Sequence, residues 1–381
     1  MALDAADPLA GWRDEFVDPG MIYLDGNSLG MAPHATLRRV DEMLRTEWAT
    51  DLIGSWEQWL DLPSRVGDRL APIIGAEAGT VVVHDSTTIN LYQAVHGALG
   101  LATQRRRGAV TTIAVDEADF PTDRYIVDGI AEAVGATVRR TTDDLDGVAV
   151  AVRSLVDYRT GRRLDLAGET ERATAAGTVT VWDLSHAAGA VEIDVTAAGV
   201  ELAVGCTYKY LNGGPGAPAF TYVRPDLQSA VRQPMWGWFA QRDQFEMADP
   251  FDPHPDPRRF LLGTPGIIGL AAAEVGIGMV ADAGIAAVAA KGRALTEFAL
   301  DIIDDLSLST PTPRSSAERG AHVAVHVDAD RLDDTHRDLT ADGVIVDRRR
   351  PDLLRIGCSA LTTRFTDVFD GLTAVARLVR P

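Results

Sequence analysis

Lysine is nearly absent from this chain. Of its 36 basic residues, only Lys209 and Lys291 are lysines, so arginine serves wherever a solvated positive charge suffices. Arginine cannot replace a lysine whose neutral amine must attack a carbonyl, because its pKa is above about 12. Lys209 follows an apolar run and precedes the glycine-rich residues 212–216. That position favours a lysine that forms a Schiff base; the alternative is a lysine that only pairs with a carboxylate.

Cysteine is equally scarce, and positive charge is in deficit. Cys206 and Cys358 have no CxxC neighbour, which argues against a zinc site or a disulfide framework, so no metal is expected. The formal net charge of −19 is spread along the chain. It disfavours nucleic acid and anionic membranes as partners, although it allows a local basic pocket for a small anion.

Long apolar runs are missing too. No stretch approaches the roughly 18 residues that a membrane-spanning helix needs. Residues 1–20 hold five acidic residues and one arginine and lack the apolar core of a secretory signal. We therefore expect a cytoplasmic protein with reduced thiols.

What is present is an alternation of short apolar runs with helix-like segments. Strands are expected at residues 81–84, 111–115, 148–155, 179–182, 200–206 and 217–223, and a helix at 89–101. Such alternation indicates βαβ units around a largely parallel sheet. The Asp/Pro/Arg-rich residues 241–259 predict an extended excursion. Beyond it, a helix at 267–290 leads into a second domain with strands at 322–327 and 353–357 and a last helix at 366–378. The basic residues 348–350 are interpreted as a solvated turn rather than a binding patch.

Four groups of residues fit one cofactor, pyridoxal phosphate (PLP), which Lys209 would hold covalently. Asp183 follows an apolar strand, at the strand end where α/β sheets bind ligands, and a carboxylate there can pair with a protonated pyridine nitrogen. The turn at residues 85–90 supplies hydroxyls and helix N–H groups for a phosphate. Phe120, just past another strand, offers a ring to stack on. The alternatives are a helix cap at Asp183, simple capping at 85–90 and an ordinary core position for Phe120.

An amino acid bound through its amine still presents a carboxylate. Arginine meets a carboxylate best, through two parallel hydrogen bonds. Arg355 lies in an apolar strand, where an unpaired charge is costly, so it is the candidate for this contact. The alternative is a structural ion pair.

Taken in order, these segments resemble the kynureninases, PLP enzymes of the aspartate aminotransferase fold (fold type I). The similarity covers most of the chain, and GCTYKYLNGGPG at 205–216 is its most specific part. The matching segments are LDGNSLG at 24–30, SW at 55–56, DSTTINL at 85–91, FPTD at 120–123, VDYRTG at 156–161, WDLSHAAG at 182–189, GWF at 237–239, GTP at 263–265 and Arg355.

The resemblance implies a large PLP-binding domain with a mainly parallel seven-stranded type of sheet at residues 51–270. A smaller α+β domain would follow at 271–381, and residues 1–50 would form an N-terminal arm and part of the small domain. It also implies a homodimer with shared active sites, in which Trp238 and Thr264 reach the phosphate of the neighbouring subunit.

The remaining site residues follow from the same resemblance. Lys209, Tyr208 and Asp183 would be catalytic, with Tyr208 a candidate acid and base. The cofactor would contact Thr87, Thr88, Phe120, Asp123, Ser154, Asp183, His186, Tyr208 and Lys209. The substrate would lie against Asn27, Ser28, Trp56 and Arg355.

The implied reaction is hydrolytic Cβ–Cγ cleavage of L-kynurenine or 3-hydroxy-L-kynurenine, in tryptophan catabolism. Two segments depart from the family pattern: Ala240-Gln241, where Gly-His is usual, and residues 358–363, where an aromatic residue is usual. These departures leave the choice between the two kynurenines open. Two rivals also stay open, a cysteine desulfurase-like enzyme and a non-catalytic PLP-binding protein. Neither cysteine stands where a desulfurase needs one, on a loop upstream of the Arg355 strand.

Overall fold

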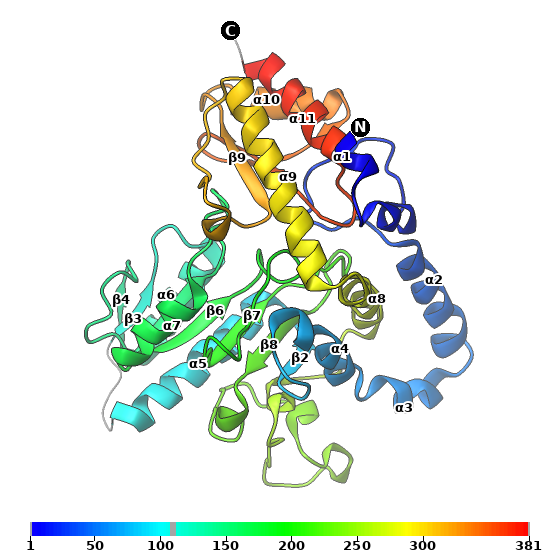
Figure 1. Cartoon of the computed structure of the whole chain (residues 1–381). Helices are drawn as coiled ribbons and strands as arrows, with labels where there is room; N and C mark the ends of the chain where they lie inside the picture. The colour runs from blue at the N-terminus through cyan, green and yellow to red at the C-terminus, as the bar shows by residue number, and fades with distance from the viewer. Residues whose placement is uncertain (1, 107–111, 380–381) are drawn as a thin grey trace.

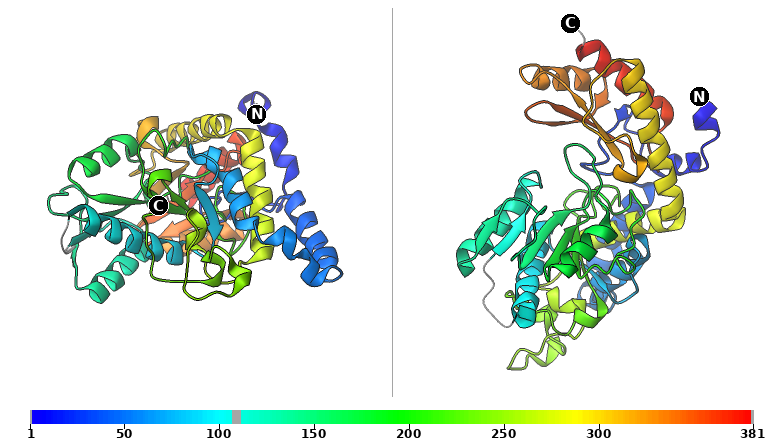
Figure 2. Two further views of the ribbon diagram at one scale, coloured as in Figure 1. Left: turned by 90° about the horizontal axis from the view of Figure 1, so that it is seen from below. Right: turned by 60° about the vertical axis from the view of Figure 1, so that its left-hand side comes forward.

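A seven-stranded and a three-stranded β-sheet lie one above the other in the computed structural model, which describes residues 2–106 and 112–379 (Figures 1 and 2). The long helix α9 (Ile285–Asp305) packs on the small sheet at one end and on α8 (Ile267–Ala283) at the other. The N- and C-terminal segments both lie beside the small sheet (Figure 1).

The large sheet has seven strands in the order β2-β8-β7-β6-β5-β3-β4. Only β8 runs antiparallel to its neighbours, so the other six strands end at the same edge. The strands are β2 (Val81–His84), β3 (Thr112–Val115), β4 (Thr137–Arg139), β5 (Val150–Ser154), β6 (Val179–Asp183), β7 (Leu202–Gly205) and β8 (Ala219–Val223).

Both faces of this sheet are covered, which explains why its central strands are apolar without alternation. In β2, Val81 and Val83 belong to one apolar cluster and Val82 to the other. The first cluster holds α4 (Leu62–Leu70) and α8, and the second holds α5 (Thr87–Arg106) and α6 (Pro121–Val134). The sheet is therefore a rigid central layer whose polar strand ends are free to build a site.

The small sheet joins β11 (Asp347–Arg349), β12 (Leu353–Gly357) and β9 (His322–His326), all antiparallel. Helices α9 and α11 pack against each other beside it. The other elements are α1 (Ala2–Ala5), β1 (Ile22–Tyr23), α2 (His34–Glu42), α3 (Trp56–Trp59), α7 (Leu166–Ala175), α10 (Leu332–Ala341), β10 (Val344–Ile345) and α11 (Phe365–Val379). β1 pairs with β10, which joins the N-terminal segment to this small layer.

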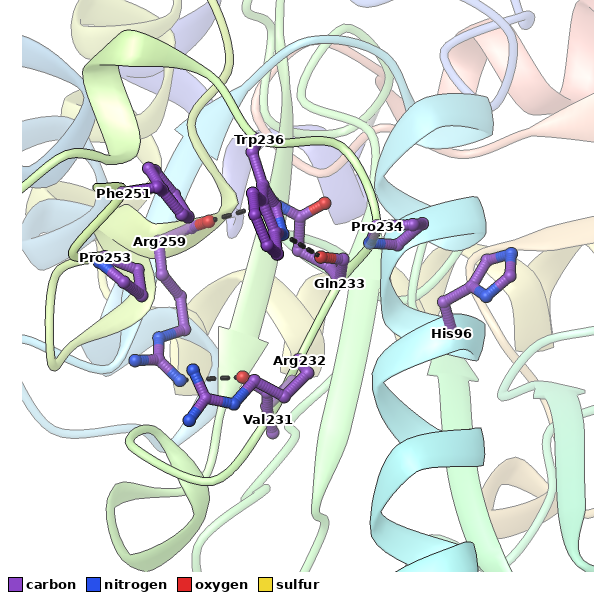
Figure 3. Close-up of a pocket in the computed structure, with 9 residues that line it drawn as sticks. All are labelled: His96, Val231, Arg232, Gln233, Pro234, Trp236, Phe251, Pro253 and Arg259. Atoms are coloured by element: carbon purple, nitrogen blue, oxygen red, sulfur yellow. Dashed lines mark hydrogen bonds between the residues drawn. The ribbon is translucent and has the colours of Figure 1, made fainter. Parts of the chain in front are cut away.

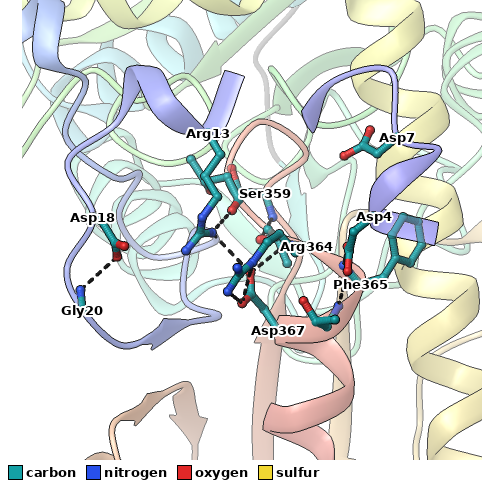
Figure 4. A network of polar contacts seen from close by, with 12 residues as sticks. Asp4, Asp7, Arg13, Asp18, Gly20, Ser359, Arg364, Phe365 and Asp367 are labelled. Atoms are coloured by element: carbon teal, nitrogen blue, oxygen red, sulfur yellow. Dashed lines mark hydrogen bonds and ion pairs between the residues drawn. The ribbon is translucent and has the colours of Figure 1, made fainter. Parts of the chain in front are cut away.

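Charged side chains fasten the first residues of the chain to the end of it (Figure 4). The Asp4 carboxylate accepts from the backbone N–H of Phe365 at 2.7 Å, at the start of α11. Arg13 Nη1 pairs with Asp367 Oδ2 at 3.2 Å. Lys291 Nζ lies 2.6 Å from Asp7 Oδ2 with both side chains buried. Lys291, the second lysine of the chain, therefore has a structural role, because its amine is held in a buried ion pair.

Most predicted elements are present. The predicted strand at 353–357 is β12, and the last helix is α11; Thr111, the first residue of one predicted strand, lies outside the described residues. The single helix predicted at 267–290 is wrong. The helix breaks at Gly284, whose φ of +81° is unfavourable for other residues, and α9 begins after it.

In the described part of the chain, no single helix has the length and apolar character to cross a membrane. Helices α8 and α9 meet that criterion only as a pair, across an 83° bend.

Candidate active site

A cavity of about 200 Å³ opens at the carboxyl edge of the large sheet, below the small sheet. Most of the residues predicted for the site line it. The lining consists of Asn27, Ser28, Thr87, Thr88, Phe120, Thr122, Asp123, Ser154, Tyr158, Asp183, Ser185, His186, Tyr208, Lys209 and Arg349.

Strand ends and the helix start beside them place the polar groups of this cavity. Ser154 ends β5 and Asp183 ends β6, side by side in register. The turn after β2 holds Asp85 at φ +43°, a left-handed conformation that Asp tolerates better than most residues. It leads directly into α5, so Thr87 and Thr88 present the first N–H groups of a 20-residue helix, which have no acceptor within that helix.

The Lys209 loop follows β7 and turns back through Asn212, which is also left-handed at φ +53°. Gly30 packs directly on this loop and donates its N–H to Tyr208 O at 2.8 Å. A Cβ at Gly30 would lie 2.5 Å from Lys209 O, so only glycine permits this approach. The 24–30 segment thereby buttresses the lysine.

His186 lies between two cationic groups. Its Nε2 is 3.3 Å from Lys209 Nζ and 3.4 Å from Arg355 Nη1. Burial, aided by the charges of Lys209 and Arg355, lowers the pKa of His186 well below its usual range. The ring is therefore neutral at physiological pH and serves as an acceptor for these donors.

Three carboxyl groups converge behind Ser154. The Ser154 N–H donates to Asp119 Oδ1 at 3.3 Å, and its hydroxyl donates to Asp123 Oδ2 at 3.4 Å. Burial raises the pKa of Asp119 to about 7. Burial, together with the charges of Asp183 and Asp119, raises the pKa of Asp123 well above its usual range. Asp123 therefore retains its proton at neutral pH, and Asp119 is about half protonated there.

An aromatic face borders the same cavity. Phe120 precedes α6 and is 38% exposed, which is high for so large an apolar side chain. Its ring meets Tyr158 edge-on, with the ring centroids 5.1 Å apart. Phe120 is not the ordinary core residue of the alternative interpretation, and its exposed face is available to a planar ligand.

Arg355 is completely buried and does not itself line the cavity. Its Nε donates to Asp347 Oδ2 at 2.6 Å, and Nη2 reaches the same oxygen. Nη1 donates to Tyr158 O at 2.6 Å, and Nη2 donates to Ser28 Oγ at 3.1 Å. With its amide oxygen facing Arg355, Asn27 adds a further acceptor at 3.1–3.2 Å. The structure shows the ion pair of the alternative interpretation, and Arg355 reaches the cavity wall through its contact with Ser28.

The solvated-turn interpretation of residues 348–350 is wrong for Arg349. Residues Asp347–Arg349 form strand β11, paired antiparallel with β12. Arg349 lines the cavity, and its Nη2 lies 3.0 Å from Asp347 Oδ2. Arg350 does lie at an exposed turn. The strand is three residues long, too short for sequence periodicity to mark it.

Besides Arg355, three predicted site residues are absent from the lining of the cavity. Trp56 and Trp238 contact each other, with ring centroids 6.4 Å apart. Thr264 is exposed between the excursion and α8. In this chain, Trp56, Trp238 and Thr264 therefore lie apart from the cavity that Lys209 lines.

Sequence comparison decides the family. The chain is 40% identical to the kynureninase of Deinococcus radiodurans over 398 residues, which cover 99% of this chain and 95% of that protein. It is also 40% identical to the kynureninase of Pseudomonas fluorescens over 400 residues, covering 100% and 94%. The chain belongs to the kynureninase family. The profile of the kynureninase C-terminal domain matches residues 288–375.

Solved structures confirm the predicted fold class for this kynureninase-family chain. The cysteine desulfurase of Thermococcus onnurineus superposes with a TM-score of 0.83 at 18% identity, covering 97% of each chain. C-DES, solved with glycine covalently linked to its PLP cofactor, superposes with a TM-score of 0.80 at 17% identity, covering 96% and 98%. At such identities the likeness concerns the fold alone.

The two departures from the kynureninase pattern also lie away from the cavity. Ala240 is fully buried, and Gln241 Oε1 accepts from Asp252 N–H at 2.7 Å within the excursion. Cys358 is buried in the core of the small sheet. None of the residues 240–241 and 358–363 is among those that line the cavity.

Sequence reasoning gave no role to several residues of the site. Tyr158 and Ser185 lie within two of the segments that resemble the kynureninases, and this position was the only sign in the sequence that they belong to the site. His322 was expected only as the start of a strand. It is fully buried 5.7 Å from His186, ring to ring, and neither of its ring nitrogens has a partner among the described residues.

A second hollow, of about 320 Å³, lies below the large sheet beside the excursion (Figure 3). Trp236 stacks there on Phe251, with the ring centroids 4.9 Å apart. Buried Arg259 donates from Nη1 to Val231 O at 2.7 Å. The described lining of this second hollow includes no lysine and no carboxylate. The hollow therefore lacks the groups that the predicted chemistry requires.

Proposed function

We propose that this chain hydrolyses the Cβ–Cγ bond of L-kynurenine, of 3-hydroxy-L-kynurenine, or of both, with PLP as its cofactor. The products are L-alanine and anthranilate or 3-hydroxyanthranilate. Membership of the kynureninase family supports the reaction. The observation that carries it is the meeting of Lys209, Asp183 and exposed Phe120 in one cavity at the sheet edge.

The cavity fits a phosphorylated pyridine. Lys209 would attach the cofactor, Phe120 would cover one face of the ring, and Asp183 would pair with the ring nitrogen. Thr87 and Thr88 at the α5 N-terminus would hold the phosphate, where free N–H groups and the helix dipole favour an anion. The wider shell would include Asp123, Ser154, His186 and Tyr208.

When bound, PLP supplies an electron sink for the carbon from which a proton is removed. Lys209 takes the α-proton of the substrate. The Asp183 carboxylate keeps a proton on the ring nitrogen, and its own Oδ1 is held by the Ser185 N–H at 2.8 Å. Tyr208 would donate its proton to the γ-carbonyl oxygen as water adds there, and would take a proton back from the resulting diol as the Cβ–Cγ bond breaks. Burial raises the pKa of Tyr208, so its hydroxyl starts this step protonated.

The substrate would occupy the side of the cavity formed by the N-terminal segment and the small sheet. Asn27 and Ser28 line it there, and Arg355 lies directly behind Ser28. The substrate carboxylate would be received at this end. Trp56 would contact the aromatic part of a substrate once the partner subunit is in place.

We also propose a homodimer with shared sites. Large apolar side chains are exposed in two segments, at 48–53 and 236–247. Trp56, which follows the first segment, contacts Trp238 in the second. Such a surface is expected to be covered by protein. Trp238 and Thr264 would then reach the phosphate in the neighbouring subunit.

The desulfurase alternative requires an accessible cysteine thiolate. Cys206 and Cys358 are both buried, and burial raises the pKa of each thiol. The likeness to a desulfurase fold therefore does not extend to its chemistry. We place the enzyme in the cytoplasm, where such thiols stay reduced.

The test is an anthranilate fluorescence assay of the PLP-loaded protein with L-kynurenine and 3-hydroxy-L-kynurenine side by side. Product release from either supports the proposal, and the ratio of kcat/KM values decides between them. A yellow protein that turns over neither would favour the non-catalytic alternative. A protein that gains no cofactor absorbance would contradict every PLP-based function.

A further inference from the structure

Arg349 is the one cationic residue in the cavity lining, apart from Lys209, among the described residues. It has no part in the chemistry above. Its side chain is 32% exposed, and Nη1 and Nη2 contact Asp347 at 3.1 and 3.0 Å. Its Nε is buried without a hydrogen-bond partner among the described residues. A buried unpaired donor is costly, so its position calls for an acceptor.

In Arg355, which lies directly behind Arg349, every N–H group has an acceptor. A guanidinium has five N–H groups. Asp347 takes the one on Nε and one on Nη2, and Ser28 takes the other on Nη2. Tyr158 O and His186 Nε2 take those on Nη1. An incoming carboxylate can reach Arg355 only by displacing one of these partners.

The register of β11 places the two arginines around one carboxylate. Asp347 stands opposite Arg355, and side chains two apart on a strand share a face, so Arg349 lies on the same side as Asp347. Arg348 points the other way and pairs with Asp333 at 3.0 Å.

Asp25 is a second carboxyl group near both arginines, and burial raises its pKa to about 6. Burial therefore disfavours the charged form of Asp25 beside these two arginines.

We propose that Arg349 is the second guanidinium of a two-arginine receptor for the substrate's α-carboxylate. It donates directly from the cavity wall while Arg355 holds Asp347 behind it. This inference rests on the proposed function, since it assumes an amino-acid substrate at Lys209. Arg349 is then a specificity-determining residue, which favours amino acids with a free carboxylate over their amides.

The experiment titrates PLP-loaded protein with L-alanine and with L-alaninamide, and follows the cofactor absorbance. The two probes share an amine and differ only in the carboxylate. We expect the wild type to bind L-alanine more tightly, and Arg349→Gln to lose about ten-fold or more of that preference. Arg349→Lys, which keeps the charge without the planar fork, should lose less. The control Arg348→Gln removes a neighbouring charge on the opposite face and should keep the full preference.

A structural role of Arg349 would weaken both probes equally, so an unchanged ratio in Arg349→Gln overturns the inference. So does a wild type that does not prefer the acid over the amide. If Arg349→Gln does not fold, the decision passes to Arg349→Lys, in which a full wild-type preference overturns the inference. With L-kynurenine, the inferred contact raises KM in Arg349→Gln while kcat changes by only a few-fold. A further outcome separates the two proposals. If the wild type releases no anthranilate but prefers L-alanine, and Arg349→Gln loses that preference, the proposed function is overturned and the inference is supported.

Discussion

Asp347 faces Arg355 across the antiparallel pair β11–β12, and its carboxylate binds a guanidinium that has no exposed surface. The pair joins the small sheet to the cavity, because Arg355 also reaches Ser28 and the Tyr158 carbonyl. Removing one partner of a buried ion pair is costly, because the other charge stays buried without its partner.

Arg355→Ala should therefore affect both stability and substrate binding. It leaves Asp347 with Arg349 alone, and we expect a loss of about 3 kcal/mol in the free energy of unfolding. KM for L-kynurenine should rise at least ten-fold, and Arg355→Lys should be milder in both respects. Denaturant unfolding and steady-state kinetics measure the two effects. The control Arg314→Ala breaks an exposed pair with Asp304 and should cost less than about 1 kcal/mol. A KM within two- or three-fold of wild type in Arg355→Ala would exclude Arg355 from the carboxylate site.

Asp183→Asn keeps the shape of the side chain and removes the charge that holds a proton on the cofactor nitrogen. We expect kcat to fall by about 10²- to 10³-fold, as for other groups that stabilise developing charge. PLP should still attach to Lys209, which the absorbance of the loaded protein reports. Near-normal kcat would reduce Asp183 to a residue that only caps the Ser185 turn. The helix cap that the sequence left open does not apply, because residues 185–190 form a turn and not a helix.

The shared-site dimer predicts complementation between two defective chains. Lys209→Ala and Trp238→Ala/Thr264→Ala proteins should each have little activity alone. After subunit exchange, half of the dimers are hybrids with one intact site each, so about a quarter of wild-type activity should return. Exchange is checked with differently tagged chains. Proven exchange without recovery would place Trp238 and Thr264 away from the partner's site.

Asp119 should make stability depend on pH in cofactor-free protein. Burial raises its pKa to about 7 from an unfolded value of 3.8, so the folded state binds the proton more tightly than the unfolded state. Stability is then favoured at low pH and declines as pH rises from about 4 through 7. Between pH 5 and pH 8, the stability advantage of Asp119→Asn, which cannot ionise, over wild type should grow by about 3 kcal/mol. Urea unfolding at both pH values measures the gain, and exposed Asp143→Asn is the control. An Asp119→Asn gain no larger than that of the control would mean that Asp119 is ionised without penalty.

The sequence predicted what local patterns encode. Asp183 and Lys209 follow apolar strands, and Thr87 begins a helix, so their meeting at one sheet edge follows from the parallel order of the strands. The near-absence of lysine singled out Lys209, and the structure accounts for the other lysine through its buried pairing with Asp7.

What the sequence could not give depends on register and on distant contacts. Arg349 acquires its place because Asp347 stands opposite Arg355, a relationship between two strands that no single segment contains. The Asp119–Ser154 contact likewise joins residues 35 positions apart in the chain. The break at Gly284 was missed because the predicted helix holds four glycines, and the other three, Gly269, Gly276 and Gly278, are tolerated within α8.

The central claim is that Lys209 carries a cofactor with which this chain cleaves kynurenine. The most direct measurement compares wild-type and Lys209→Arg proteins, loaded with PLP, reduced with borohydride and digested for mass spectrometry, beside an anthranilate fluorescence assay with L-kynurenine. We predict that the wild type carries the reduced cofactor on Lys209 and releases anthranilate, and that folded Lys209→Arg does neither. Cofactor found on Lys291, or anthranilate released at a wild-type rate by Lys209→Arg, would contradict the account.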